Sequence, residues 1–325
     1  MRKLVYILLF WTPLLNAEEI FKKPLFLMGC DFEITVVAPN QSEANRAFDL
    51  AESEITRIEN LISSWKTNSQ TSSINQNSGV KAVEVDAELI QLIQRSLAIS
   101  KLTDGAFDIS YAAMDRIWQF DGSMEQLPSK TEIEASVRKV GYQNIEVSLE
   151  ENTVFLKEKG MRIGFGGIGK GYAADRAKKI LQEKGFDSGI INASGDMSAW
   201  GLMPSGNPWK VAITNPLAKE KSFALLPIKN QAIVTSGDYE KYVEIAGERY
   251  SHIIDPRSGM PTKGIVSVTV IAPKAELADA LATAVFVMGS QTGLDRINQI
   301  PKVECIIVQT DGSIVQSNNI QLETK

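Results

Sequence analysis

The chain has 325 residues and a formal net charge of −5, with 44% hydrophobic and 7% aromatic residues. This is the composition of an ordinary globular protein, long enough for one large or two medium-sized domains. Because the balance is mildly acidic and no cluster of Lys and Arg contradicts it, the sequence argues against nucleic-acid binding.

The chain begins with a basic start and an apolar run that ends near Ala17. This pattern is typical of a signal peptide and is too short for a confident membrane span. We therefore expect residues 1–17 to be a signal peptide and the mature protein to be exported and periplasmic, with an association with the inner membrane left open. No repeat or clear linker divides residues 18–325, so a single domain is expected.

Two cysteines, Cys30 and Cys305, cannot form a disulfide framework. Both lie in apolar, strand-like sequence, so buried free thiols are the expected state. A single bridge between them is the alternative.

The first half of the mature chain predicts two strands followed by helices. Strands are expected around Met28–Gly29, and an apolar stripe at three- and four-residue spacing predicts a long helix capped by Ser42. Residues 63–77 form a polar loop whose aromatic residue, Trp65, is either simply exposed or caps a flat ligand. Further helices are expected from Asp86 to near Thr103 and from the capping box at Ser129 to Gly141.

The second half is mostly β. A hairpin is expected over Thr153–Ile163, turning at Lys159-Gly160, and a helix from Tyr172 to Lys184 is stopped by Gly185. The remaining expected elements are strands around 189–192, 209–214, 222–228, 232–235, 242–254, 265–272 and 303–309, and a buried helix over 276–288. Since this order is not a regular βαβ alternation, an α+β fold is favoured over a doubly wound sheet.

The stretch from Arg162 to Asp175 carries a glycine loop that opens a helix. Bare backbone N–H groups beside the positive end of a helix, with Lys170 at the same point, suit an anion or a phosphate. The glycines also match G-x-G-x-x-G and G-x-x-x-x-G-K, but Gly171 stands where a P-loop needs Ser or Thr. Export counts against ATP and nicotinamide, and glycines needed only for helix–strand packing are the alternative.

Two further places are candidates for chemistry. In the apolar helix 275–288, Asp279 and Thr283 share one face, and their oxygens suit a hard cation such as Mg²⁺. The alternative is that Asp279 caps the first turn and Thr283 bonds back to a carbonyl. His252, the only histidine, lies at a strand end beside Asp255 and Arg257, where a catalytic and a structural role are equally open.

Seven stretches in order resemble the ApbE-like family of FAD:protein FMN transferases, from about Leu27 to Gly289. They are Met28-Gly29, the Trp65 loop, Asp104–Asp108, Gly166–Asp175, Thr235–Tyr239, Ser251–Pro256, and Val270–Pro273 with Asp279 and Thr283. The resemblance implies the family's α+β fold, with mixed, mostly antiparallel sheets packed with helices.

The resemblance also implies roles for individual residues. FAD contacts are implied at Met28, Trp65, Ala106, Phe107, Asp108, Lys170 and Ile254, and a metal between the Gly167 carbonyl and the Asp279 and Thr283 side chains. Three departures stand out: Gly164 where the family often has Asp, Trp65 in place of Tyr, and Ala282 in place of a second carboxylate.

Exported members of the family join FMN from FAD to a Ser or Thr of membrane redox proteins through a phosphoester. A pyrophosphate carries charge that Mg²⁺, Lys170 and backbone N–H groups neutralise, and His252 is the candidate to take the hydroxyl proton. The competing hypotheses are an FAD pyrophosphatase that forms FMN and AMP, a non-catalytic exported flavin-binding protein and, last, a nicotinamide oxidoreductase. The acceptor protein and the oligomeric state are not encoded in any recognisable pattern.

Overall fold

The computed structural model describes residues 18–121, 123–215, 218–238 and 242–320. The predicted signal peptide, residues 1–17, lies outside this part of the chain. The described residues form a central sheet in which every neighbouring pair is antiparallel. Its strands in spatial order are β1 (Glu19–Leu27), β2 (Cys30–Ala38), β6 (Gly189–Ala193), β7 (Asp196–Trp200), β10 (Ala232–Gly237), β13 (Ile265–Ala272), β14 (Glu304–Gln309) and β15 (Ile314–Gln316).

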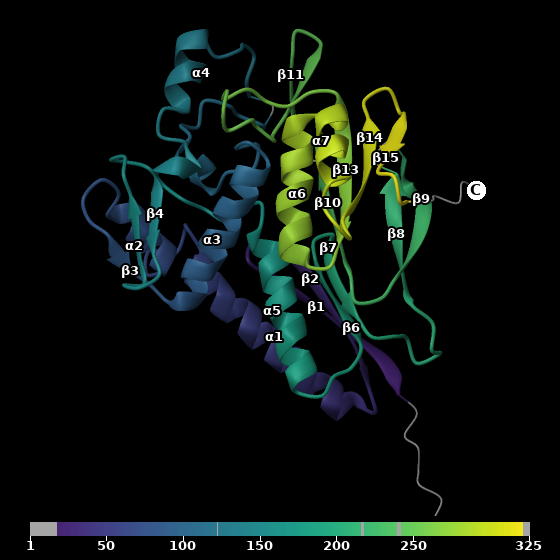
Figure 1. Ribbon diagram of the computed structural model, residues 1–325. Helices are drawn as coiled ribbons and strands as arrows, with labels where there is room; N and C mark the ends of the chain where they lie inside the picture. The colour runs from purple at the N-terminus through teal and green to yellow at the C-terminus, as the bar shows by residue number, and fades with distance from the viewer. Residues whose placement is uncertain (1–17, 122, 216–217, 239–241, 321–325) are drawn as a thin grey trace, which may run out of the picture.

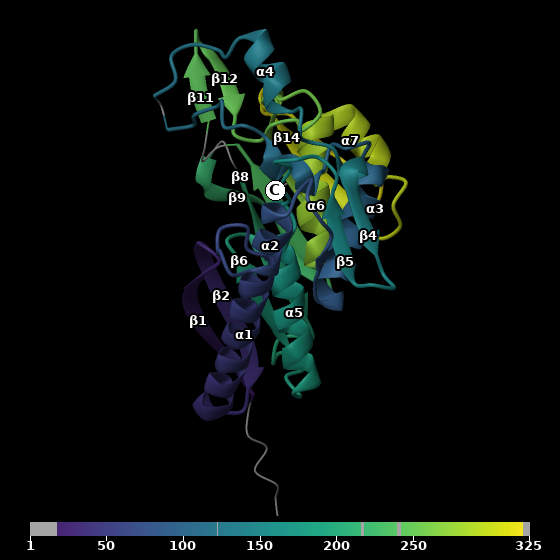
Figure 2. The same ribbon diagram turned by 90° about the vertical axis from the view of Figure 1, so that its left-hand side faces the viewer.

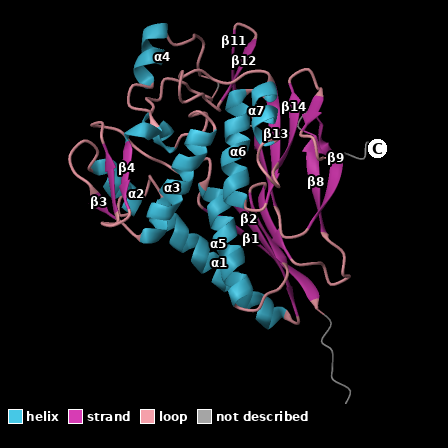
Figure 3. Ribbon diagram, in the orientation of Figure 1, coloured by secondary structure: helices cyan, strands magenta, loops and turns pink. Residues whose placement is uncertain are grey.

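Helices cover one face of this sheet and a β-hairpin covers part of the other (Figures 1 and 3). The helices on the sheet are α1 (Gln41–Ile62), α5 (Gly169–Glu183), α6 (Ala275–Met288) and α7 (Ser290–Ile297), and α3 (Ala87–Leu102) packs against α6. The hairpin strands are β8 (Trp209–Asn215) and β9 (Ala218–Ile228). Strand β13 is buried at every residue because it lies between the two layers. No helix in the described ranges has the length and apolar character needed to cross a bilayer.

The two helices that carry the predicted site form as the sequence indicates. Helix α5 ends before Gly185, which has a φ of +85°, the left-handed conformation that glycine adopts without strain. Helix α6 is buried on nearly all sides, including at Asp279. Figure 2 shows α1 and α5 packed side by side, and α6 extends the same layer.

Smaller elements surround the upper end of this layer (Figure 2). They are α2 (Gln70–Gln76), β3 (Val83–Glu84), β4 (Ile145–Ser148), β5 (Thr153–Leu156), α4 (Lys130–Ser136), β11 (Tyr242–Ile245), β12 (Glu248–Ser251) and two 3₁₀ turns at Ile109–Ala113 and Tyr142–Asn144. Trp118 and Tyr250 stack with their ring centroids 5.8 Å apart, in a second apolar cluster beneath the β11–β12 hairpin. This cluster supports the segment that ends at His252.

The α+β class with mostly antiparallel sheets is confirmed, but several boundaries differ from the prediction. The predicted hairpin turn at Lys159-Gly160 is wrong, because β5 pairs backwards with β4 through the turn at 149–152. The helix predicted to stop at Gly141 ends at Ser136. The predicted polar loop contains α2, residues 242–254 hold a hairpin rather than one strand, and α7 was not predicted.

Both cysteines are free, as expected for thiols that do not pair. Cys305 is buried, whereas Cys30 is only half-buried, beside Lys170 and Asp196.

Candidate active site

The glycine loop leads from the segment beside α2 into the first turn of α5. Its glycines have different roles. A Cβ at Gly169 would lie 2.9 Å from Ile62 Cδ1, and one at Gly167 would lie 3.1 Å from Thr283 Oγ1. A Cβ at Gly166 would meet nothing within 4 Å, because this residue faces a cavity. Close packing therefore explains Gly167 and Gly169. At Gly166 the missing side chain instead leaves the backbone accessible from the cavity.

Gly171 separates this loop from a nucleotide-binding P-loop. A Cβ at this position would lie 2.3 Å from the carbonyl oxygen of Ala275, at the point where α5 crosses the start of α6. The Ser or Thr that a P-loop needs therefore has no room here. The Gly171 N–H instead donates to Asp279 Oδ2 at 3.1 Å.

We expect Gly171→Ala to destabilise the fold by about 3 kcal/mol, the upper end of the usual cost of overpacking, because the clash is with backbone rather than with a movable side chain. Gly166→Ala is the matched control, since the added methyl group meets open space. Denaturant unfolding of both variants measures the difference, and equal stabilities would show that the α5–α6 crossing relaxes easily.

The predicted metal ligands lie where α5 and α6 meet. Asp279 is 4% exposed, and Thr283 lies one turn later in α6, with its hydroxyl beside Gly167. Burial, together with the nearby Asp196, raises the pKa of Asp279 to about 8, while Lys170 opposes both effects. A buried carboxylate beside a hydroxyl and a backbone carbonyl suits a hard cation, which would restore the ionised form.

The alternative interpretation of Asp279 as a cap of its own helix is wrong. Helix α6 begins at Ala275 after Lys274, which makes no side-chain cap, and Asp279 lies in the second turn. Its carboxylate accepts from the first turn of α5 instead. Within the described ranges Thr283 makes no hydrogen bond to a carbonyl of its own helix, and no three His, Cys, Asp or Glu side chains gather as a metal cluster. The donor set is thus one carboxylate with neutral oxygens.

Lys170 is held by a partner that the sequence did not identify. Its Nζ lies 2.6 Å from Asp196 Oδ2, and Asp196 is 1% exposed. The tight turn between β6 and β7, with Ser194 and Gly195 at positive φ, carries Asp196 to this position. Burial raises the pKa of Asp196, while the Lys170 charge opposes the shift, so the ion pair fixes the lysine beside the loop.

Two cavities open along the loop, one on each side of Trp65. The first has a volume of about 720 Å³ and the second about 580 Å³, and they share Ser64, Trp65, Phe165 and Gly166. Two connected spaces of this size suit a ligand with two ring systems. Trp65 is 74% exposed and lies between them, and the Arg116 guanidinium lies over one face of its indole, with Cζ 5.0 Å from the ring centroid.

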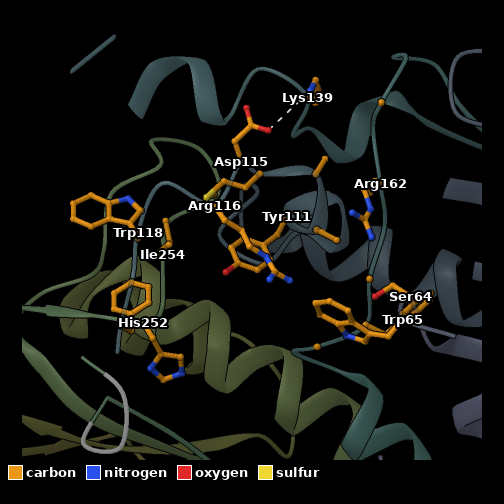
Figure 4. Close-up of a pocket in the computed structure, with 18 residues that line it drawn as sticks. Ser64, Trp65, Tyr111, Asp115, Arg116, Trp118, Lys139, Arg162, His252 and Ile254 are labelled. Atoms are coloured by element: carbon orange, nitrogen blue, oxygen red, sulfur yellow. Dashed lines mark ion pairs between the residues drawn. The ribbon is translucent and has the colours of Figure 1, made fainter. Parts of the chain in front are cut away.

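The predicted residues divide between these cavities. Met28 and Lys170 line the second cavity, and His252 and Ile254 line the first. Figure 4 shows His252 and Trp65 on opposite sides of the first cavity, with Tyr111 and Arg116 between them. The Phe120 ring meets the His252 imidazole edge to face, with centroids 6.4 Å apart. The structure thus gathers residues that lie in distant parts of the chain.

Ala106, Phe107 and Asp108 are buried beneath the loop and line neither cavity. The Phe107 ring packs under Gly167. The Asp108 carboxylate accepts from the N–H and hydroxyl of Ser110 and from the Tyr142 N–H, at 2.7, 2.6 and 2.8 Å. Asp108 therefore organises the chain around the 3₁₀ turn, and direct FAD contacts at these three residues stay a prediction.

Several cavity residues were not predicted from the sequence. Tyr111, Arg116 and Arg162 line the first cavity, and Asn75 of α2 holds the start of the loop by donating to the Ile163 carbonyl and accepting from its N–H. Arg162 lies two residues before Gly164, and this nearness to the glycine loop is the one local signal that pointed to it.

A model of the ApbE family matches residues 28–307 of this chain. The chain is 30% identical over 308 residues to an FAD:protein FMN transferase of Klebsiella pneumoniae, covering 94% of each chain. It is 32% identical over 297 residues to an FAD:protein FMN transferase of Escherichia coli, covering 82% of this chain and 85% of the relative.

Solved structures show the same similarity. The crystal structure of the ApbE protein from Thermotoga maritima matches with a TM-score of 0.83 at 32% identity, covering 92% of this chain and 97% of that one. The flavinyl transferase ApbE of Pseudomonas stutzeri matches with a TM-score of 0.82 at 24% identity, over 93% and 95% of the two chains, which bears on the fold alone.

Proposed function

Since the chain belongs to the ApbE family and is an FAD:protein FMN transferase, we propose that it transfers FMN to a Ser or Thr hydroxyl of a membrane redox protein in a magnesium-dependent reaction. The observation that carries the proposal is that the positive charge and the candidate base lie on opposite sides of Trp65. An anion cradle with Lys170 lies on one side, and His252 lies on the other.

The proposed reaction exchanges one phosphorus–oxygen bond for another. The acceptor hydroxyl oxygen bonds to the phosphorus on the FMN side of FAD. The bond from this phosphorus to the bridging oxygen breaks, and AMP leaves with that oxygen. The hydroxyl proton goes to the His252 imidazole, which lies in the first cavity where the acceptor would enter.

The residues of the second cavity stabilise the negative charge that builds up on the pyrophosphate. Lys170 brings one positive charge, already oriented by Asp196, and it lies in the first turn of α5, at the positive end of the helix dipole. Because these groups are in place before FAD binds, little reorganisation is needed during the reaction.

Asp279, Thr283 and the Gly167 carbonyl would hold the magnesium ion. When bound, the ion supplies positive charge beside the transferring phosphoryl group. The proposal is supported by the donor chemistry, since all three groups present oxygen and Asp279 is the one that ionises. Ala282 leaves no second carboxylate in this turn, so binding is expected to depend strongly on Asp279.

The place of action that we propose is the periplasm, on the basis of the basic and apolar start of the sequence. Membrane redox proteins expose soluble segments there. Their Ser or Thr side chains would reach the first cavity, which is lined by exposed residues such as Tyr111, Asp115 and Arg116.

An assay of covalent transfer tests this proposal. The mature protein is incubated with FAD, magnesium and candidate soluble domains of membrane redox proteins, and flavin fluorescence is read from a denaturing gel. We expect a fluorescent acceptor band with magnesium and none with a chelator. Release of FMN and AMP at the same rate with and without every acceptor would favour the pyrophosphatase, and stable FAD with no product would favour a flavin-binding protein.

A further inference from the structure

The starts of α5 and α6 lie against each other, and neither helix has a side-chain cap from its own N-cap residue. In Figure 1 the lower end of α6 meets the upper end of α5, where Gly171 and Ala275 bring the two first turns into contact. Neither Ile168, before α5, nor Lys274, before α6, makes a side-chain cap hydrogen bond. The first backbone N–H groups of each helix therefore need acceptors from elsewhere, because they have no partner within the helix.

Each helix supplies a carboxylate to the other. Asp175 of α5 accepts from the Glu276 N–H in the first turn of α6, at 3.0 Å. In the opposite direction, Asp279 of α6 accepts from the Gly171 N–H of α5, at 3.1 Å. The second oxygen of Asp175 accepts from the Ser198 hydroxyl of β7, at 2.8 Å. Asp175 thus caps a helix to which it does not belong and ties that helix to the central sheet.

The position of α6 decides whether the proposed metal ligands can meet. Asp279 lies four residues after Ala275, and Thr283 lies four residues further along the helix. The third oxygen belongs to Gly167, in the loop that leads into α5. A slip of α6 by one residue would move both of its ligands by about 1.5 Å, whereas magnesium needs oxygens at about 2.0–2.1 Å in near-ideal geometry. The metal site therefore depends on the register between the two helices.

We propose that Asp175 is a positioning residue for the metal site: by capping α6 from α5, it holds Asp279 and Thr283 where magnesium can bind. This inference rests on the proposed function, which includes the metal site. Asp175 lines neither cavity, so its effect is exerted through the backbone of α6. Loss of a group that orients metal ligands typically lowers metal affinity by about 10- to 100-fold.

Three substitutions of Asp175 separate the hydrogen bond from the charge, with magnesium alone titrated into the full chain by calorimetry. Asp175→Ala removes the cap, and magnesium affinity should fall by at least about tenfold. Asp175→Asn loses the charge but keeps an acceptor oxygen, and its affinity should stay within about twofold of the wild type, since Asn and Asp cap helices equally well. Asp175→Glu keeps the charge but displaces the carboxylate by one methylene, and it should bind magnesium as weakly as Asp175→Ala.

Asn40→Ala is the matched control for the loss of a helix cap. Asn40 caps α1 by accepting from the Glu43 N–H at 3.0 Å. Ile62, at the other end of this 22-residue helix, packs against Gly169, so Asn40 lies about 30 Å away along the helix. The control should unfold at a lower denaturant concentration than the wild type and bind magnesium with wild-type affinity.

Three results would overturn the inference. They are wild-type magnesium affinity in Asp175→Ala (or in Asp175→Glu where the alanine variant does not fold), an Asp175→Asn variant that binds as weakly as Asp175→Ala, or an equal loss of affinity in Asn40→Ala. The second result would assign the effect to charge, and the third to a general loss of stability.

The calorimetric measurement requires no transfer. A failed transferase assay with normal magnesium binding would therefore count against the proposed function alone. A wild type that binds no magnesium would remove the metal site and this inference with it.

Discussion

Replacement of Asp279 by Asn is expected to lower magnesium-dependent flavin transfer by at least about 100-fold, the usual size of losing one strong electrostatic stabiliser. Asp279 is the only side chain of the proposed metal site that ionises, and an amide cannot supply its charge. Initial rates over a magnesium series measure the effect. Near-full activity at low magnesium would leave Asp279 as no more than the acceptor for the Gly171 N–H.

The stability of the same variant separates a lost metal ligand from a damaged fold. The folded, metal-free protein keeps the Asp279 proton up to about pH 8, whereas an unfolded chain loses it near about pH 4. Unfolding therefore releases a proton in this interval, and the stability of the metal-free wild type falls as the pH rises through it. The amide of the Asp279→Asn variant does not ionise and can still accept from the Gly171 N–H. The metal-free variant should therefore be at least as stable as the wild type at about pH 7.

Magnesium should stabilise the wild type and not the Asp279→Asn variant, because a ligand that binds only the folded state raises the unfolding free energy. Thermal unfolding with and without magnesium reads this directly. A variant that unfolds early without metal would show that the buried carboxylate has a structural role that the amide does not replace.

The helices of the core were predictable because their periodicity is local. The apolar stripe of α1 and the nearly uniform apolar character of α6 follow from the sequence alone, as does the end of α5 at Gly185. The hairpin predicted at Lys159-Gly160 is wrong, although Gly160 does lie in a turn, with a φ of +80°. A turn signal does not say which strand pairs with which, and residues 161–163 are held by Asn75 rather than by a strand.

The candidate site shows the same difference between local patterns, which were predictable, and long-range contacts, which were not. The glycine loop and the spacing of Asp279 and Thr283 are short-range patterns, and both meet at the α5–α6 crossing. The Lys170–Asp196 ion pair joins the start of α5 to the start of β7. No sequence pattern in either segment indicates that the two residues pair. Long-range pairs of this kind depend on topology, which the sequence patterns did not specify.

His252 is the residue whose replacement should separate chemistry from binding most clearly. If it is the general base, His252→Ala is expected to slow flavin transfer by about two to four orders of magnitude. FAD affinity should change much less, because the base acts on the acceptor hydroxyl and lies across the first cavity from Trp65. Single-turnover transfer and equilibrium FAD titration measure the two quantities.

The pH dependence of the transfer rate distinguishes a general base at His252 from a purely structural histidine. A base accepts a proton only in its neutral form, so the wild-type rate should rise with pH through the titration of the imidazole and then level off. The residual rate of His252→Ala should lose this rise. The variant His252→Gln, which keeps hydrogen-bonding capacity but is not a base, should behave like His252→Ala.

A carboxylate such as Asp108 is the alternative candidate for the base, and Asp108 is expected to fail in this role for a structural reason. Its carboxylate already accepts three hydrogen bonds from Ser110 and Tyr142, and burial raises its pKa without bringing it into either cavity. Asp108→Ala should therefore lower stability, with rate and stability falling together. A His252→Ala enzyme that binds FAD normally and transfers flavin at the wild-type rate would remove the histidine from the mechanism.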